Sequence, residues 1–436
     1  MNPSSDRDRR YQSALTEVRR LLAERRADEA AAASLDLADA YRDAVDPLLL
    51  LGKARQQQGR FDEMLQLAND ALTLDANHRG AQLQRAEACI FCGRHESALE
   101  QLAALERDAL NEPRLLQHVA GFYAHSGKHR EAHRCYLRAV ELMPDDSAAL
   151  YNLASSYVAV GELALAEQAY TKVIELNPAD YDAWQNRSTL RTQTPDDNHV
   201  AALTESLNKL SPNDPGEVPL CYALAKEYED LGEFRQSFAL LARGAASRRR
   251  RMAYDVQNDV RVMTRIAELF DSAYANEAPH ASERQGPIFV MGLPRSGTTL
   301  VDRIISSHSQ VESLGEINDF ALTLTRLGKS ADKNRLLEAS LSIDPDELGS
   351  AYVQSARRYG GKAKYFIDKT PANFLYIGLI ARALPGVPVV HVRRHPVDSC
   401  LAMYRTLFRM GYPFSYDLGD LADYYIAYDR LMRHWR

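Results

Sequence analysis

The sequence predicts two architectures in one chain: an all-α solenoid of helical repeats, followed by an α/β domain with a parallel sheet. Two observations predict the solenoid. Glycines recur at a constant spacing, and each is followed by an apolar pattern with helical periodicity. A third observation predicts the α/β domain, since short apolar strands alternate with helical stretches from residue 288 onward. We place the solenoid over residues 1–280, with its clearest units at 45–180, and the α/β domain over residues 285–436.

The repeat is defined by residues with different physical roles at fixed positions. Four glycines are evenly spaced along the chain: Gly59, Gly93, Gly127 and Gly161. Five positions after each glycine comes a residue suited to close helix packing: Met64, Ala98, Ala132 and Ala166. Glycine permits the tight turn between antiparallel helices, and Pro144 and Pro178 end units because proline cannot continue a helix.

This pattern resembles the tetratricopeptide repeat, whose period of about 34 residues equals the glycine spacing here. The resemblance implies stacked helix pairs with a concave face that binds a protein or peptide. A spacer without a specific ligand is the alternative. Residues 11–44 are expected to form a divergent first unit, since Ala30 precedes Met64 by one full period.

The repeat loses its phase after residue 190. Gly232 follows Gly161 by slightly more than two periods, so it is out of step with the earlier glycines. The elements expected in this part are loops at 194–198 and 211–216, a helical pair at 222–243 and a helix at 261–275.

The α/β part begins with a buried strand that runs into a phosphate-binding loop. Strands are expected at 288–291, 364–367 and 389–392, with helices at 299–306 and 373–383. The spacing Gly292-x-x-x-x-Gly297-Thr298-Thr299 matches the P-loop pattern, but Thr298 stands where that pattern has lysine. The backbone amides and the helix N-terminus still favour a phosphate. Because the absent lysine normally contacts the β- and γ-phosphates, a kinase or NTPase is a disfavoured alternative.

Cationic side chains follow each of the three expected strands. Arg295 follows the first strand, Lys369 the second, and Arg393 and Arg394 the third. The carboxyl ends of parallel strands meet at one edge of the sheet, so these cations are expected to converge on one anionic ligand.

Residues 287–410 resemble the sulfotransferases that use 3′-phosphoadenosine 5′-phosphosulfate (PAPS). Within that family they are similar to bacterial tetratricopeptide-repeat sulfotransferases and, more distantly, to tyrosylprotein sulfotransferases. The loop P-R-S-G-T-T-L at 294–300 and the R-x-P-x-D element at 394–398 carry the resemblance. It implies that PAPS is the co-substrate without a metal, and that the acceptor is a hydroxyl group, such as a protein tyrosine or a glycan.

The resemblance also implies how the donor is held. The residues that correspond to the loop binding the 5′-phosphosulfate are Arg295, Ser296, Gly297, Thr298 and Thr299. Arg394 corresponds to the arginine that holds the 3′-phosphate. The family usually has a serine eight residues later, where this chain has Ala402, and Ser399 or Arg393 are possible substitutes.

Three residues are expected to carry the catalysis. Lys369 is expected to stabilise the bridging oxygen as it becomes charged, with Arg295 assisting. Glu316 resembles the general base of tyrosylprotein sulfotransferases, with a one-residue slip in the alignment near Gly315. Asp368 is interpreted as a partner of Lys369. Three histidines compete for the role of base but are interpreted as structural: His308, His391 and His395.

Composition and context limit the other classes of function. A net charge of -6 gives no support for a nucleic-acid binder, and the run Arg248 to Arg251 is interpreted as a solvated helix end or linker. The five scattered cysteines do not suggest a disulfide framework, and the Cys89-x-x-Cys92 pair is interpreted as buried helical cysteines rather than a metal site. No apolar segment has the roughly 20 residues of a membrane span, and no signal peptide is evident, which favours a cytoplasmic protein.

The C-terminal end affects what the α/β domain is expected to contain. The sequence ends at Arg436 within an expected helix, whereas domains of this family usually continue for on the order of another hundred residues. We therefore expect the domain to be incomplete. A non-catalytic repeat scaffold with a degenerate nucleotide-binding domain is the main alternative to an active enzyme.

Overall fold

The computed structural model describes residues 3–271, 274, 286–329, 333–359, 363–409 and 411–436. It divides into two units, residues 1–183 and residues 184–436, each of which is considered by itself. The domain boundary predicted at 280–285 lies outside the described residues and stays a prediction.

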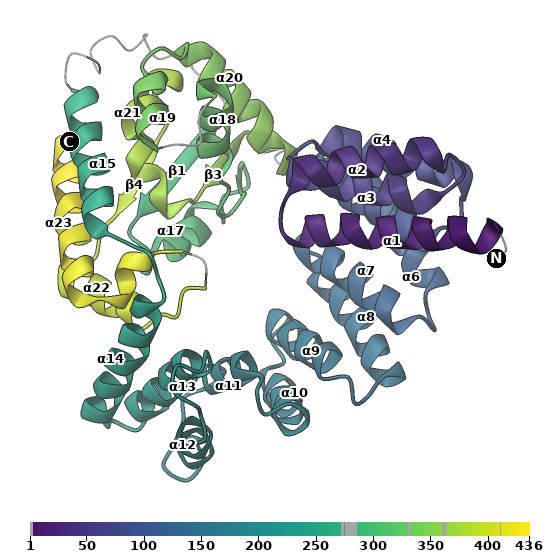
Figure 1. The fold of residues 1–436 in the computed structure, drawn as a ribbon. Helices are drawn as coiled ribbons and strands as arrows, with labels where there is room; N and C mark the ends of the chain where they lie inside the picture. The colour runs from purple at the N-terminus through teal and green to yellow at the C-terminus, as the bar shows by residue number, and fades with distance from the viewer. Residues whose placement is uncertain (1–2, 272–273, 275–285, 330–332, 360–362, 410) are drawn as a thin grey trace. The chain divides into compact units, whose positions relative to one another are not determined.

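Unit 1 is a row of antiparallel helix pairs (Figure 1). Its helices are α1 (Pro3–Ala23), α2 (Ala27–Ala40), α3 (Val45–Gln57), α4 (Phe61–Leu74), α5 (Arg79–Phe91), α6 (His95–Asp108), α7 (Pro113–His125), α8 (His129–Leu142), α9 (Ser147–Val160) and α10 (Leu163–Leu176). The four predicted turn glycines all have positive φ, between 71° and 90°. The four packing residues that follow them are at most 1% exposed, so both predicted roles are confirmed.

The first helix pair makes the same turn without a glycine. Arg25 precedes Gly59 by one repeat period and has a φ of 58°. It connects α1 to α2, so the predicted divergent first unit is a helix pair in phase with the others. A side chain in this left-handed region costs roughly 1–2 kcal/mol relative to glycine.

Unit 2 begins with helices that lie outside the phase of the repeat. They are the C-terminal part of α11 (Tyr181–Ser188), then α12 (Val200–Asn208), α13 (Glu217–Asp230), α14 (Phe234–Arg250) and α15 (Val256–Leu269). The pair predicted at 222–243 corresponds to α13 and α14, and Gly232 between them has a φ of 78°. The helix predicted at 261–275 begins earlier and ends at Leu269.

The arginine run at the end of α14 corrects one prediction. It is a helix end, but two of its members are half-buried within unit 2. Arg249 pairs with Asp420 at 2.7 Å, and Arg248 donates to the Arg409 carbonyl at 2.9 Å. These arginines therefore fasten α14 to the C-terminal part of the unit instead of facing solvent.

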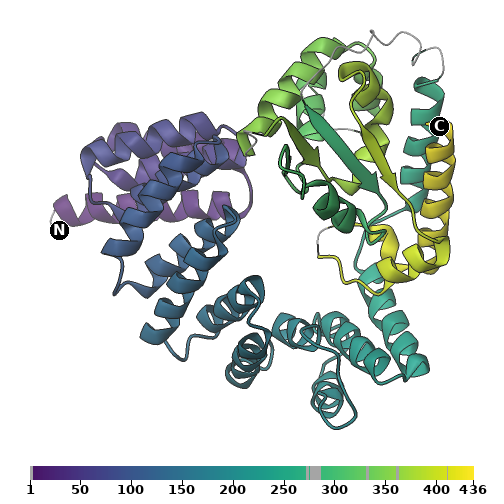
Figure 2. The same ribbon diagram turned by 180° about the vertical axis from the view of Figure 1, so that it is seen from behind.

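The α/β part contains a four-stranded parallel sheet in the order β2-β3-β1-β4 (Figure 2). The strands are β1 (Pro287–Gly292), β2 (Val311–Ser313), β3 (Tyr365–Asp368) and β4 (Val389–Val392). The three predicted strands are present, whereas the short strand β2 was not predicted. Because β1 lies between β3 and β4, the chain segments that follow these three strands lie at one edge of the sheet.

Helices and short 3₁₀ segments surround the sheet. They are α17 (Thr298–Ile305), α18 (Asp319–Gly328), α19 (Lys333–Ser340), α20 (Pro345–Ala356), η1 (Arg357–Tyr359), η2 (Pro371–Tyr376), α21 (Ile377–Ala383), α22 (Pro396–Tyr404), η3 (Pro413–Tyr416) and α23 (Leu418–His434). The helix predicted at 373–383 is therefore split, because its first turn is the 3₁₀ segment η2.

One apolar core joins the sheet to the preceding helices. Phe289 of β1 stacks on Tyr352 of α20, with ring centroids 5.6 Å apart. Tyr222 of α13 and Met263 of α15 belong to the same buried cluster as Phe289. The α/β fold therefore shares its core with helices upstream of residue 280.

Candidate functional site

The loop after β1 has the backbone of a phosphate cradle. Gly292 and Gly297 have φ values of 153° and 106°, and Arg295 has a φ of 65°. A Cβ on Gly292 would lie 2.4 Å from the carbonyl oxygen of Val392 on the neighbouring strand, so this position requires glycine. Gly297 is the N-cap of α17, whose first residue is Thr298, so the amide groups at this helix end are available to an anion.

The side chains of this loop differ in exposure. Arg295 and Thr299 are exposed, whereas Thr298 is buried. Ser296 is 9% exposed, and its Oγ has no hydrogen-bond partner among the described residues. A buried hydroxyl without a hydrogen-bond partner costs free energy, so a ligand that bonded to the Ser296 hydroxyl would stabilise the folded chain.

Lys369 and Glu316 form an ion pair at the neighbouring strand ends. The Lys369 Nζ lies 2.5 Å from Glu316 Oε1, and the Lys369 side chain is 8% exposed while that of Glu316 is 55% exposed. Backbone bonds set this contact, because Leu314 N–H donates to the Ile367 carbonyl and Lys369 N–H donates to the Gly315 carbonyl. These bonds extend the pairing of β2 with β3 and bring together two of the three predicted catalytic residues, Lys369 and Glu316, whereas Arg295 lines a cleft that neither of them lines.

Asp368 has a structural environment instead of the predicted pairing with Lys369. It is fully buried at the end of β3, where it accepts hydrogen bonds from the Tyr352 hydroxyl at 2.9 Å and from Thr370 N–H at 3.1 Å. Burial raises the pKa of Asp368 to about 6, although these hydrogen bonds lower it in part. The hydrogen bond from Tyr352 therefore joins the end of β3 to α20.

Arg394 and Arg295 line one cleft of about 380 Å³, a size in the range of small-molecule sites. Ala402 of α22 also lines it, beside Arg405 and Thr406. Arg394 Nε lies 3.7 Å from Asp398 Oδ2, and both side chains are about half exposed. The predicted 5′- and 3′-phosphate arginines thus face a common cleft.

One part of this cleft's lining was not anticipated from the sequence. It comes from α13, through Tyr222, Lys226 and Glu229. No motif marks these residues, and they are distant in sequence from the phosphate loop. Their place in the site follows from the shared core that packs α13 near the sheet.

The residues suggested as substitutes for the missing serine have other environments. Arg393 pairs with Asp429 of α23 at 3.2 Å, and Ser399 is buried within α22. Neither is among the described residues that line the cleft around Ala402.

The three histidines near the strand ends differ in their environments. His391 on β4 lies 2.5 Å from the Tyr428 hydroxyl, and burial lowers its pKa. His308 is exposed, and its Nδ1 accepts a hydrogen bond from Gln310 N–H at 3.2 Å. His395 is exposed at the N-cap of α22.

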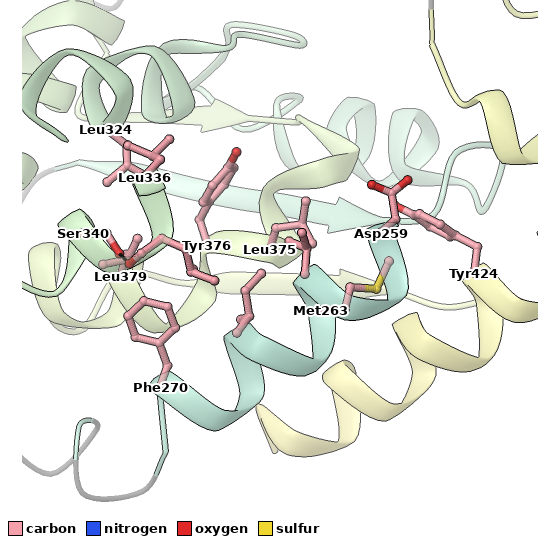
Figure 3. Close-up of a pocket in the computed structure, with 13 residues that line it drawn as sticks. Asp259, Met263, Phe270, Leu324, Leu336, Ser340, Leu375, Tyr376, Leu379 and Tyr424 are labelled. Carbon is pink, nitrogen blue, oxygen red and sulfur yellow. Dashed lines mark hydrogen bonds between the residues drawn. The ribbon is translucent and has the colours of Figure 1, made fainter. Parts of the chain in front are cut away.

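A second cavity, of about 100 Å³, is apolar and is lined by residues other than the predicted site residues (Figure 3). Met263 of α15 and Phe270, just after that helix, line it together with Leu375 and Leu379, while Asp259 and Tyr424 lie at one end. The Asp259 carboxylate is already engaged by the Tyr254 hydroxyl at 2.8 Å. This cavity is a gap in core packing, because its described lining lacks convergent polar groups that suit the predicted chemistry.

Three further features concern metals, membranes and cysteines. Across the described part of the chain, no group of three or more His, Cys, Asp or Glu side chains is placed to hold a metal ion. None of the described helices is long and apolar enough to cross a membrane. All five cysteines are free thiols, and Cys89 is buried in α5 as predicted, whereas Cys92 is half-buried just after that helix.

Comparisons with known families agree with both sequence motifs. Residues 287–436 match the sulfotransferase family, and residues 147–180 match the tetratricopeptide repeat. The chain therefore combines a tetratricopeptide-repeat solenoid with a sulfotransferase-family domain that has a parallel sheet. The family resemblance and the fold class predicted from the sequence are confirmed.

Individual relatives cover parts of the chain. An uncharacterized protein of Aquifex aeolicus (strain VF5) is 28% identical over 257 residues, which are 55% of this chain and 33% of that protein. The match thus spans about a third of that relative's length. A thermophilic tetratricopeptide-repeat protein of Thermus thermophilus is 21% identical over 41% of this chain and 98% of its own, with a TM-score of 0.36. Part of a repeat-containing protein of Cytophaga hutchinsonii is 14% identical over 53% of this chain and 94% of its own, with a TM-score of 0.39.

Proposed function

We propose that the chain transfers a sulfuryl group from PAPS to a hydroxyl acceptor, and that its repeats recruit the acceptor or a partner protein. The single observation that carries the proposal is the shared cleft of Arg295 and Arg394. A donor with two separate phosphate positions needs two separate cationic contacts. ATP would instead need a lysine in the loop, where this chain has Thr298.

The residues present fit the donor's 5′-phosphosulfate. The positive φ angles of the loop orient backbone amides as in other anion-binding loops, and the buried Ser296 hydroxyl has a donor to offer. Gly292 lets the loop pass close to β4 without a clash. Arg295 adds a charge that is exposed on the same side as the cleft.

The reaction needs separate roles for Lys369 and Glu316. A new bond forms between the acceptor oxygen and sulfur, while the bond between sulfur and the bridging oxygen breaks and leaves adenosine 3′,5′-bisphosphate. Glu316 receives the acceptor proton, and Lys369 stabilises the charge that develops on the bridging oxygen. Their 2.5 Å contact supports the assignment of the base and the cation to a single reacting centre.

The repeats of unit 1 provide the proposed binding surface for a protein or peptide. Helix pairs that stack in this way form extended concave surfaces in other repeat proteins. We propose that the acceptor is presented on such a partner, with a protein tyrosine or a glycan as the hydroxyl source. A cytoplasmic location, where free thiols persist, accords with the five free cysteines.

The donor is tested first, by calorimetry on the full chain with three nucleotides. Adenosine 3′,5′-bisphosphate is expected to bind more tightly than adenosine 5′-monophosphate, and ATP with magnesium is expected to bind weakly. Equal affinity for the bisphosphate and the monophosphate would contradict the two-phosphate site. Tight ATP binding would favour the NTPase alternative.

The transfer itself is tested with labelled PAPS and a cell extract, followed by identification of the labelled product. Label on a hydroxyl group is expected with the wild type and is expected to be lost in Glu316→Gln. Binding of the bisphosphate without any transfer would favour the alternative of a non-catalytic scaffold.

A further inference from the structure

The cleft that contains Arg394 has a wall from outside the sulfotransferase-matched residues. The match covers residues 287–436, whereas Lys226 and Glu229 lie on α13 (Glu217–Asp230). Both walls belong to unit 2 and share one apolar core, so their arrangement is part of a single packed structure.

The charges that line this cleft favour an anion. The cationic members are Lys226, Arg295, Arg394 and Arg405, and the acidic members are Glu229 and Asp398. Arg405 pairs with Glu229, Arg394 is near Asp398, and Lys226 pairs with Asp230 of the same helix, so these residues together carry one positive charge in excess. That excess and the N–H donors of the cationic side chains favour an anionic phosphate group.

Lys226 is held in place but retains a donor. Its Nζ lies 2.5 Å from Asp230 Oδ2 and also donates to the Arg191 carbonyl. An ammonium group has three N–H donors, so one is left for a ligand in the cleft. Because both existing contacts fix the side chain, little conformational entropy is lost when a ligand binds.

A neighbouring hydroxyl adds to this wall. Tyr222 lies one turn before Lys226 on α13 and also lines the cleft. It is 4% exposed, and its hydroxyl has no hydrogen-bond partner among the described residues. A buried hydroxyl without a partner gains free energy when a ligand accepts its hydrogen bond.

We infer that α13 completes the 3′-phosphate site of the donor, with Lys226 supplying the contact that the family's serine would make at Ala402. This inference rests on the proposed function and assigns the 3′-phosphate a second contact besides Arg394. Ala402 has no hydroxyl to offer and lines the same cleft as Lys226. The helix before the matched domain thus becomes part of the donor site.

The test is calorimetry on the full chain with adenosine 3′,5′-bisphosphate and adenosine 5′-monophosphate. Lys226→Met is expected to weaken bisphosphate binding by about 10- to 100-fold, as for loss of a charged hydrogen bond, and to leave monophosphate binding unchanged. Lys226→Arg keeps the cation and is expected to keep most of the preference for the bisphosphate. The matched control is Lys209→Met, because Lys209 also pairs with an acid four residues away, Glu205 at 2.7 Å, and is not among the described residues that line the cleft.

A second variant separates binding from folding. Ala402→Ser in the Lys226→Met background restores a hydroxyl to the cleft and is expected to recover part of the lost bisphosphate affinity. Equal losses for both nucleotides, or no loss in Lys226→Met, would overturn the inference while the proposed function stands. A wild type that does not prefer the bisphosphate would overturn the proposed two-phosphate site and this inference together.

Discussion

Two glycines of the phosphate loop are expected to fail in different ways when they are changed to alanine. A Cβ on Gly292 would lie 2.4 Å from the Val392 carbonyl oxygen, which is closer than real Cβ contacts. Alanine there also adopts a φ of 153° at a cost of roughly 1–2 kcal/mol. Separating β1 from β4 to relieve the clash adds roughly 1–3 kcal/mol, so Gly292→Ala is expected to destabilise unit 2 by about 3 kcal/mol.

Gly297→Ala is the matched comparison. Its φ is 106°, but the nearest atom to an added Cβ is Val392 Cγ1 at 3.9 Å, so the cost is limited to roughly 1–2 kcal/mol of backbone strain. The added methyl group lies on the exposed loop where the phosphosulfate is proposed to bind. Gly297→Ala is therefore expected to lose at least about tenfold in bisphosphate affinity while it remains folded.

Thermal unfolding and calorimetry together measure this difference. At about 2–4 °C per kcal/mol for a domain of this size, Gly292→Ala is expected to lower the melting temperature of unit 2 by about 6–12 °C, and Gly297→Ala by about 2–8 °C, which is one to two thirds of that shift. Equal melting temperatures for the two variants would refute the steric reasoning. Unchanged bisphosphate binding by Gly297→Ala would refute the placement of the phosphosulfate at this loop.

Three further predictions concern catalysis, pH and the first repeat. Lys369→Met is expected to slow single-turnover sulfuryl transfer about 10²- to 10³-fold. The free energy of unfolding is expected to change by less than about 1 kcal/mol, because the partner Glu316 is 55% exposed and stays solvated. A variant that kept the full rate would show that Lys369 does not have the proposed role. The pKa of Asp368 is about 6 in the folded chain against 3.8 for the free group, so the protonated carboxyl stabilises the folded state fully below pH 4. This stabilisation is expected to be lost as the pH rises through 6, by on the order of 2–3 kcal/mol in the free energy of unfolding. Denaturation at several pH values is expected to show this fall in the wild type and not in Asp368→Asn. Arg25→Gly is expected to stabilise unit 1 by about 0.5–1 kcal/mol, because glycine adopts the positive φ of this turn without strain. At the equivalent turn of the next repeat, Gly59→Ala is expected to destabilise unit 1 by about 1 kcal/mol. Thermal melts that show no change in either variant would contradict the assignment of backbone strain to these turns.

Local patterns in the sequence predicted the elements whose geometry is set by nearby residues. The repeat glycines have positive φ because a tight turn between antiparallel helices requires it, and the residues five positions after them, one methionine and three alanines, are buried because the helices approach closely. The three longer strands were likewise evident from their apolar runs. The strand β2 was missed because three residues, Val311–Ser313, give too short a pattern to distinguish from a loop.

Contacts between distant segments could not be predicted in the same way. Asp368 was expected to pair with its neighbour Lys369. Backbone pairing of β2 with β3 instead places Lys369 in an ion pair with Glu316. Asp368 is buried against α20, where it accepts a hydrogen bond from the Tyr352 hydroxyl. The arginine run at the end of α14 was expected to be solvated, yet Arg249 reaches Asp420 far along the chain.

The chemistry proposed for the site was predicted from the order of amino acids: a loop with the P-loop spacing but without its lysine, a lysine and an arginine after the adjoining strands, and alanine in the place of a serine. Those features are readable because each depends on residue type at a fixed spacing from a strand. Which side chains share the cleft depends instead on packing, since α13 lines the same cleft as Arg394 because of a common apolar core and not because of any pattern along the chain. Lys226 is the residue whose role depends most on that packing.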